Sequence, residues 1–196
     1  MKNSNHRDIS NYQEEYNNHS FENIMVKYRR KCVLEQIHKY NIKNILEVGC
    51  GNEPIMKYFS DYDNMYVVEP GDEFFNNAIF FKNENKNKNI ECHQGLIENL
   101  IDKLNKVQFD FIIISSLLHE LKNNLDILKK IRELCNSETL VHINVPNKKS
   151  LHRLLAYHSG IIPSLDERSN TQIRLQQNEF FDLNELNNFI KKAGFY

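Results

Sequence analysis

Short apolar runs alternate with amphipathic segments along most of this 196-residue chain. From residue 21 to 40, apolar side chains recur at helical spacing and predict an amphipathic helix. Four later runs have the length and β-branched content of strands, at residues 44–48, 65–68, 109–114 and 140–145, with a weaker candidate at 90–93. The run at 109–114 is almost continuously apolar, as a strand buried on both faces requires.

Helical patterns lie between these runs, after Pro54 and at residues 72–82 and 123–135. Strands that alternate with helices at this spacing predict an α/β fold, in which helices cover both faces of a doubly wound, mainly parallel sheet. We expect residues 21–196 to form a single domain, preceded by a polar amino-terminal arm at 1–20 without a clear period.

The last quarter of the chain has a different pattern. A short helix is predicted at 150–157 and a polar, irregular stretch at 160–181. Residues 182–193 then form a helix with Asp182 as its amino-terminal cap and Glu185 three residues later, and Gly194 ends it.

Composition narrows the class of protein. The formal net charge of −1 argues against nucleic acid or an anionic membrane as the main partner. The four cysteines are scattered, which suits a reducing compartment better than a disulfide scaffold or a zinc site. Because the start is too polar for a signal peptide and no apolar stretch could span a bilayer, we expect a soluble, cytoplasmic protein. We expect no metal site, because no cysteine and histidine cluster has metal-ligand spacing and no convergent set of carboxylates is apparent.

Two acidic residues and a glycine loop follow the first two strands. Glu47, Gly49 and Gly51 form an E-x-G-x-G run, in which glycine lets the backbone approach a ligand and the carboxylate suits a cationic one. Glu69 ends the next strand, at the offset where an acid typically accepts hydrogen bonds from ribose hydroxyls. The alternatives are an ordinary strand-to-helix turn and a solvated acid.

The strings ILEVGCG (residues 45–51) and VVEP (67–70) resemble motifs one and two of the class I, Rossmann-like S-adenosylmethionine-dependent methyltransferases. The resemblance implies S-adenosyl-L-methionine as cofactor and S-adenosyl-L-homocysteine as product. It assigns cofactor contacts to Glu47, Gly49, Gly51 and Glu69, to the backbone of Gly95 and Leu96 near the adenine, and to Ser115. The antiparallel strands that usually complete this sheet are expected to be missing or truncated.

The segment after the fourth strand lies beside the cofactor in the resembled family and forms part of the acceptor pocket. His119 could deprotonate an acceptor near neutral pH, and Glu120 could orient it. The alternative is that His119 only packs against or caps the following helix.

A later run, PNKKSLHR (146–153), resembles bacterial small-molecule and glycan-precursor methyltransferases. It implies that residues 148–181 cover the acceptor, with contacts from His152, Arg153 and Arg168. Tyr28 and Arg29, ahead of the first motif, are further candidates for substrate binding. Together with Arg30, and with Tyr12 and Tyr16 of the arm, they could also close over the cofactor. The alternative for each is an ordinary surface or core role.

The sequence thus predicts methyl transfer to an oxygen, less favourably a nitrogen, of a small polar metabolite or glycan precursor. A nicotinamide-dependent Rossmann oxidoreductase is the first alternative, although the third glycine of its loop is absent. A non-catalytic S-adenosylmethionine-binding protein is the second. The expected partner is a small-molecule acceptor, not nucleic acid or a membrane, and a homodimer is left open.

Overall fold

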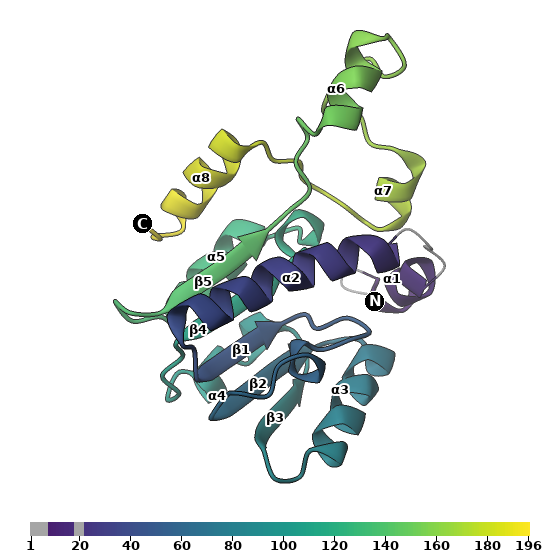
Figure 1. The fold of residues 1–196 in the computed structure, drawn as a ribbon. Helices are drawn as coiled ribbons and strands as arrows, with labels where there is room; N and C mark the ends of the chain where they lie inside the picture. Colours follow the sequence, from purple (N-terminus) through teal and green to yellow (C-terminus); the bar gives the residue numbers. More distant parts are fainter. Residues whose placement is uncertain (1–7, 18–21) are drawn as a thin grey trace.

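A five-stranded parallel sheet forms the centre of the computed structural model, which describes residues 8–17 and 22–196 (Figure 1). The strand order is β3-β2-β1-β4-β5, and every pairing between neighbours is parallel. The strands are β1 (Asn44–Val48), β2 (Asn64–Glu69), β3 (Asn89–Gln94), β4 (Phe111–Ser115) and β5 (Leu140–Asn144). This confirms the predicted α/β class and places all five predicted strands in one sheet.

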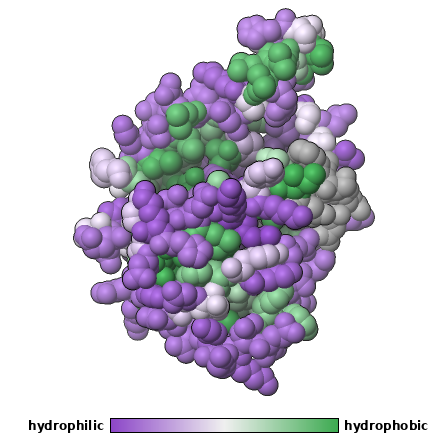
Figure 2. All heavy atoms as spheres, viewed as in Figure 1, coloured by the Kyte–Doolittle hydropathy of each residue, from purple (hydrophilic) through white to green (hydrophobic). Residues whose placement is uncertain are grey.

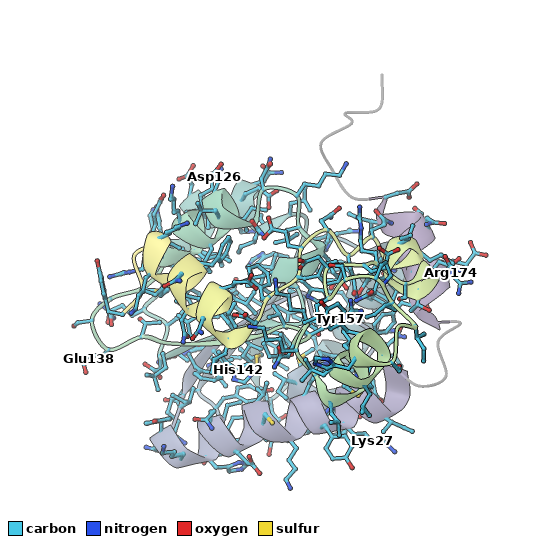
Figure 3. The ribbon with its side chains drawn as sticks, turned by 90° about the horizontal axis from the view of Figure 1, so that it is seen from above. Lys27, Asp126, Glu138, His142, Tyr157 and Arg174 are labelled. Atoms are coloured by element: carbon cyan, nitrogen blue, oxygen red, sulfur yellow. The ribbon has the colours of Figure 1, made fainter. Side chains whose placement is uncertain are left out.

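Helices cover both faces of the sheet because the central strands are apolar on both faces. Ile45 and Ile113 belong to the core beneath α2 (Glu22–Tyr40) and α3 (Asp72–Glu84). Leu46 and Ile112 belong to the opposite core, under η2 (Ile97–Asn99), α4 (Ile101–Leu104), α5 (Asn124–Arg132) and α8 (Leu183–Lys192). In Figure 3, Lys27 of α2 and Asp126 of α5 lie on opposite sides of His142, which belongs to β5.

The segment after Pro54 is one 3₁₀ turn, η1 (Ile55–Lys57), so the prediction of a helix there was wrong. The Glu47 carboxylate binds the backbone N–H of Ile55, and the chain then leaves the helical path. Phe59 and Tyr62 enter the core instead. A tertiary contact from β1 and two aromatic anchors thus override the local helical pattern.

The amino-terminal arm also differs from its prediction, since residues 9–17 form helix α1 (Ile9–Asn17). Its inward face carries Ile9, Tyr12, Gln13 and Tyr16, at the spacing of an amphipathic helix. Tyr12 packs in a cluster with Phe74 and Leu175. The period was missed because it is short and mostly polar; residues 1–7 and 18–20 of the predicted arm lie outside the described residues.

The stretch after β5 leaves the sheet and returns to it. Helix α6 (Leu151–His158) projects from the body, and α7 (Asn170–Arg174) lies at the side of α1 (Figures 1 and 3). A parallel β-bridge between Asn147 and Phe181 joins the two ends of this segment. Figure 2 shows apolar atoms gathered on the projecting end, where Leu151, Leu155 and Ile161 are exposed.

Candidate functional site

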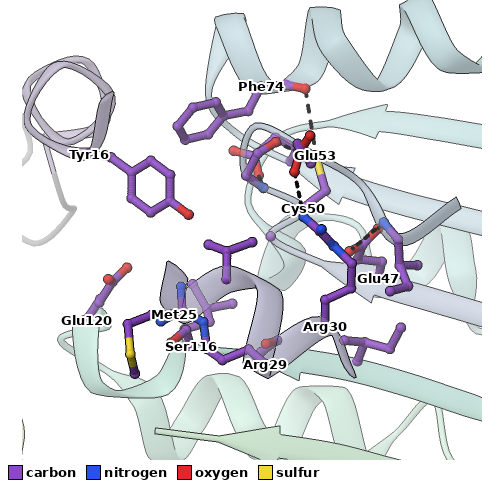
Figure 4. Close-up of a pocket in the computed structure, with 18 of the residues that line it drawn as sticks. Tyr16, Met25, Arg29, Arg30, Glu47, Cys50, Glu53, Phe74, Ser116 and Glu120 are labelled. Carbon is purple, nitrogen blue, oxygen red and sulfur yellow. Dashed lines mark hydrogen bonds and ion pairs between the residues drawn. The ribbon is translucent and has the colours of Figure 1, made fainter. Parts of the chain in front are cut away.

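Two adjoining cavities lie at the carboxyl ends of the strands, where the strand order reverses between β1 and β4. Parallel sheets bind ligands at this switch point. The larger cavity has a volume of about 250 Å³ and is walled by α1, α2 and the loops after β1, β2 and β4 (Figure 4). The smaller one, of about 80 Å³, lies beside the loop after β3. Both are lined by Gly49, Glu69 and Leu117, so one elongated ligand can extend across both.

The glycine loop after β1 turns through backbone conformations that other residues adopt with strain. Gly49 has φ +78° and Gly51 has φ +58°. The N–H of Gly49 donates to the Val68 carbonyl at 2.9 Å, which fixes the loop to the end of β2. The two glycines therefore leave bare backbone facing the cavity, as close approach of a ligand requires.

Glu69 lies at the junction of the two cavities and is 5% exposed. Its carboxylate accepts the N–H of Gly71 at 2.8 Å and that of Gly51 at 3.4 Å. Backbone donors thus hold a buried acceptor at a fixed position beside the glycine loop. A ribose bridging a base in the smaller cavity and a chain in the larger one fits this position.

Glu47 serves the loop as well as the cavity. Its two carboxylate oxygens accept the Ile55 N–H at 3.2 and 3.0 Å. Burial raises the pKa of Glu47 to about 8; the Ile55 hydrogen bond opposes this, and the charge of Glu69 adds to it. A cation in the cavity would be stabilised by the ionised form of this carboxyl.

The smaller cavity is largely apolar. Gly95 and Leu96, which the resemblance assigned to the adenine, line it together with Ile97, Leu117 and Ile127. Glu98 also lines it, three residues after Gly95, and was not singled out from the sequence. A slot of apolar side chains with a carboxylate at its edge suits a flat heteroaromatic base that carries an amino group.

His119 and Glu120 belong to a 3₁₀ turn, η3 (Leu118–Glu120), and both line the larger cavity. They are 3% and 5% exposed, and His119 Nε2 lies 3.7 Å from Glu120 Oε1. The Tyr12 hydroxyl donates to the same Glu120 oxygen at 3.2 Å. Asn178 fixes the turn, because its N–H binds the His119 carbonyl and its Nδ2 binds the Glu120 carbonyl, both at 2.7 Å.

The end of β4 is strained and held in place. Ser116 has φ +57°, which is uncommon for a residue with a side chain. Its N–H donates to the carbonyl and to Oδ1 of Asn144, at 3.0 and 2.9 Å. Asn144 also donates from Nδ2 to Ser115 Oγ at 2.9 Å. The end of β5 thus aims Ser115 and Ser116 at the cavity, which both residues line.

The arginines of α2 lie on the cavity side of the helix. Arg29 and Arg30 line the larger cavity, and Arg30 binds Glu53 at 2.6 Å while its guanidinium lies 3.5 Å from the centre of the Tyr58 ring. Tyr28 is 67% exposed and lines neither cavity. The structure therefore brings Arg29 to the site and leaves Tyr28 on the outer side of α2.

The residues predicted to contact the acceptor from the later segment lie elsewhere. Arg153 donates to the carbonyls of Leu165 and Glu167, both at 2.7 Å, and so braces this segment internally. His152 is exposed, and neither it, Arg153 nor Arg168 lines either cavity. The segment reaches the larger cavity through Leu175 and Gln177, which follow α7.

Glu98 and Gln177 line the two cavities and were not singled out from the sequence, whereas Tyr12 and Tyr16, which were expected to close over the cofactor, line the larger cavity. Tyr16 stands across the cavity from Arg29 in Figure 4. The i, i+4 spacing of the two tyrosines was the available signal for α1. Gln177 and Glu98 carried no such signal, because only the tertiary fold brings them to the ends of the strands.

Residues 21–196 match the methyltransferase domain family. No curated protein sequence matches the chain. None of the described helices is long and apolar enough to cross a membrane.

Solved structures with low sequence identity share the fold. The plantazolicin methyltransferase BamL, solved with S-adenosylhomocysteine, has a TM-score of 0.63 at 13% identity over 95% of this chain and 71% of its own. A possible histamine N-methyltransferase from Thermotoga maritima has a TM-score of 0.60 at 15% identity, over 94% and 81%. EvdMO1 has a TM-score of 0.56 at 14% identity over 85% of this chain, which spans only 35% of EvdMO1.

The matched family, the parallel sheet and the glycine loop with its buried acid agree with one another. The chain belongs to the methyltransferase domain family and has the fold of solved class I S-adenosylmethionine-dependent methyltransferases.

Proposed function

We propose that the protein transfers a methyl group from S-adenosylmethionine to an oxygen of a small polar acceptor. The observation that carries this proposal is the buried pair of His119 and Glu120, which faces the same cavity as the glycine loop. A base and a carboxylate beside a methyl donor can prepare a hydroxyl for attack.

The cofactor supplies an electrophilic methyl group on its sulfonium when it is bound. Glu69 would hold the ribose, the backbone of Gly49 and Gly51 would border the methionine part, and Gly95 and Leu96 would border the adenine. These contacts would hold the methyl donor at the larger cavity, which His119 and Glu120 also line. Such positioning is the largest contribution that a protein makes to a displacement of this kind.

His119 would accept the proton of the acceptor hydroxyl as the oxygen attacks. Its Nε2 lies 3.7 Å from Glu120 Oε1, which is longer than a hydrogen bond. Catalytic hydrogen bonds are often longer before the substrate binds and shorten in the complex. The Tyr12 hydroxyl bond to Glu120 would keep the carboxylate directed at the histidine.

The acceptor has to be small. The larger cavity measures about 250 Å³ and also has to hold the methionine part of the cofactor. Walls on opposite sides, from α1 and α2, suit a compact molecule better than a nucleic acid or a protein chain. Ser116, Arg29 and Gln177 supply polar groups for such an acceptor.

A nitrogen acceptor is the second candidate, because acidic side chains line the larger cavity. Four acidic side chains border this space, from Glu47, Glu53, Glu69 and Glu120, although Glu47 has a pKa of about 8 and Glu53 is bound to Arg30. Those that are ionised would attract an amine in its protonated form. His119 would then remove a proton from the ammonium before transfer.

The test is a screen of small hydroxyl and amine compounds with methyl-labelled S-adenosylmethionine, scored by formation of S-adenosylhomocysteine and of the labelled product. We expect turnover with compounds of one class. His119→Gln should lower turnover at least about 100-fold while the dissociation constant for S-adenosylhomocysteine changes little. Equal turnover in this variant would remove His119 as the base, and methylation confined to amines would favour the second candidate.

A further inference from the structure

Helix α1 places one polar side chain over the acid that marks the ribose position. Gln13 is 9% exposed, and its Nε2 is buried without a hydrogen-bond acceptor among the described residues. A buried amide donor without an acceptor is unfavourable and needs a reason. Its neighbours along the inner face of α1 line the cavities. Ile9 lines the smaller cavity, and Tyr12 and Tyr16 line the larger one.

The Gln13 amide lies directly above Gly71, close to the Glu69 carboxylate. A Cβ atom on Gly71 would lie 2.9 Å from Gln13 Nε2 and 3.1 Å from Glu69 Oε1. The amide and the carboxylate therefore both border the space above Gly71. Glu69 lines both cavities, and the Gln13 side chain, which lines neither, lies behind it. Gly71 has an ordinary backbone conformation, with φ −80° and ψ 128°, so a side chain at this position would compete with the end of the Gln13 side chain for space and would not strain the backbone.

Several contacts hold α1 in this position. Gln176 binds the backbone of Asp8 twice, accepting its N–H at 2.9 Å and donating to its carbonyl at 2.8 Å. The Tyr12 hydroxyl binds Glu120 at 3.2 Å, and Tyr16 meets the Phe74 ring edge-on at 5.7 Å. The helix is thus tied to both sides of the cavity, and Gln13 has a defined place between these ties.

We propose that Gln13 is a cofactor-binding residue, whose side-chain amide donates a hydrogen bond to a ribose hydroxyl that Glu69 accepts from. A hydroxyl can accept one hydrogen bond while it donates another, so the amide and the carboxylate are complementary partners for it. The bound ribose would then supply the acceptor that Gln13 Nε2 lacks. The inference rests on the proposed function only through its cofactor and is independent of the acceptor.

The test is calorimetric titration with S-adenosylhomocysteine and with its 2′-deoxy and 3′-deoxy analogues. Gln13→Leu keeps the bulk of the side chain and removes the amide. We expect it to weaken S-adenosylhomocysteine binding by about three- to tenfold, the effect of one hydrogen bond. The loss should disappear with the analogue that lacks the hydroxyl concerned, because that analogue offers Gln13 nothing to bind.

Two further variants complete the design. Gln13→Glu keeps the size of the side chain but loses the donor when ionised, and it should weaken binding at least as much. Glu14→Gln, at the exposed neighbouring position on α1, should leave binding unchanged. Far-ultraviolet circular dichroism checks that each variant is folded.

Three results would overturn the inference. Gln13→Leu and Gln13→Glu could both bind like the unsubstituted chain, or both could weaken all three ligands equally, which would mean that Gln13 acts by packing α1. Failure of the unsubstituted chain to bind S-adenosylhomocysteine would remove the cofactor assignment itself. That failure is distinguishable, because it appears before any substitution is made.

Discussion

At the scale of single residues, the site depends on carboxylates that the fold buries. Glu69 is fixed by two backbone donors, and Glu47 is fixed by the start of η1. Both positions were predicted from the sequence, because the order of acid and glycine after a strand has a direct physical meaning. The contact of Glu47 with Ile55 was not predicted, because it depends on a helix ending after one turn.

Glu47 gives the binding reaction a dependence on pH. Its pKa is about 8 without ligand, so the carboxyl is mostly protonated at pH 7. A cationic ligand favours the ionised form and lowers this pKa, so binding of S-adenosylmethionine at pH 7 should release up to about one proton. Affinity should therefore increase as the pH rises toward 8 and level off above it.

Calorimetry at pH 7 in buffers of different ionisation enthalpy measures this proton. Glu47→Gln should abolish the release, and Glu84→Gln, at an exposed position of α3, should not change it. An observed binding enthalpy that is the same in every buffer would contradict this account of Glu47.

At the scale of elements, one wall of the larger cavity is formed where β4 and β5 end. Asn144 on β5 holds Ser116 of the neighbouring strand end in its left-handed conformation. The strands themselves were predicted from their apolar runs. The segments predicted least well include α1 and η1, because their conformation depends on contacts with distant residues such as Gln176, Glu120 and Glu47. Helix α7 was also not predicted, although a local capping box of Ser169 and Gln172 marks its start.

Loss of the Asn144 side chain should destabilise the end of β4, where Ser115 and Ser116 lie. Asn144→Ala removes the bonds from Oδ1 and Nδ2 to Ser116 and Ser115, so the free energy of unfolding should fall by about 1–3 kcal/mol. Denaturant titration measures the change, with Asn188→Ala at an exposed position of α8 as the control. A fall no larger than that of the control would mean that the strained turn is stable without its partner.

At the scale of the whole molecule, the cavity joins segments from distant parts of the sequence. Helix α1, the turn η3 and the stretch after α7 meet through Tyr12, Asn178 and Gln176. The resemblance of the motifs to class I methyltransferases assigned residues to the cofactor side of this assembly only. The acceptor side was predicted less well, since Arg153 and Arg168 bind carbonyls of their own segment, and Leu175 and Gln177 face the cavity instead.

Ligand binding should therefore stabilise this assembly as a unit. With S-adenosylhomocysteine bound, backbone amides of α1 and η3 should exchange hydrogen more slowly, because both elements border the ligand. Amides of α8 should change little, because that helix lines neither cavity. Protection confined to the glycine loop would show that α1 does not cover the cofactor.

The central claim is that the ends of β1 and β2 form a site for S-adenosylmethionine. Isothermal titration of the chain with S-adenosylhomocysteine and, in parallel, with NAD tests it most directly. We expect micromolar binding of S-adenosylhomocysteine, weakened by about 1–3 kcal/mol in Glu69→Ala and unchanged in Glu84→Ala, with no binding of NAD. Binding of NAD in place of S-adenosylhomocysteine, or an unchanged affinity in Glu69→Ala, would contradict the account.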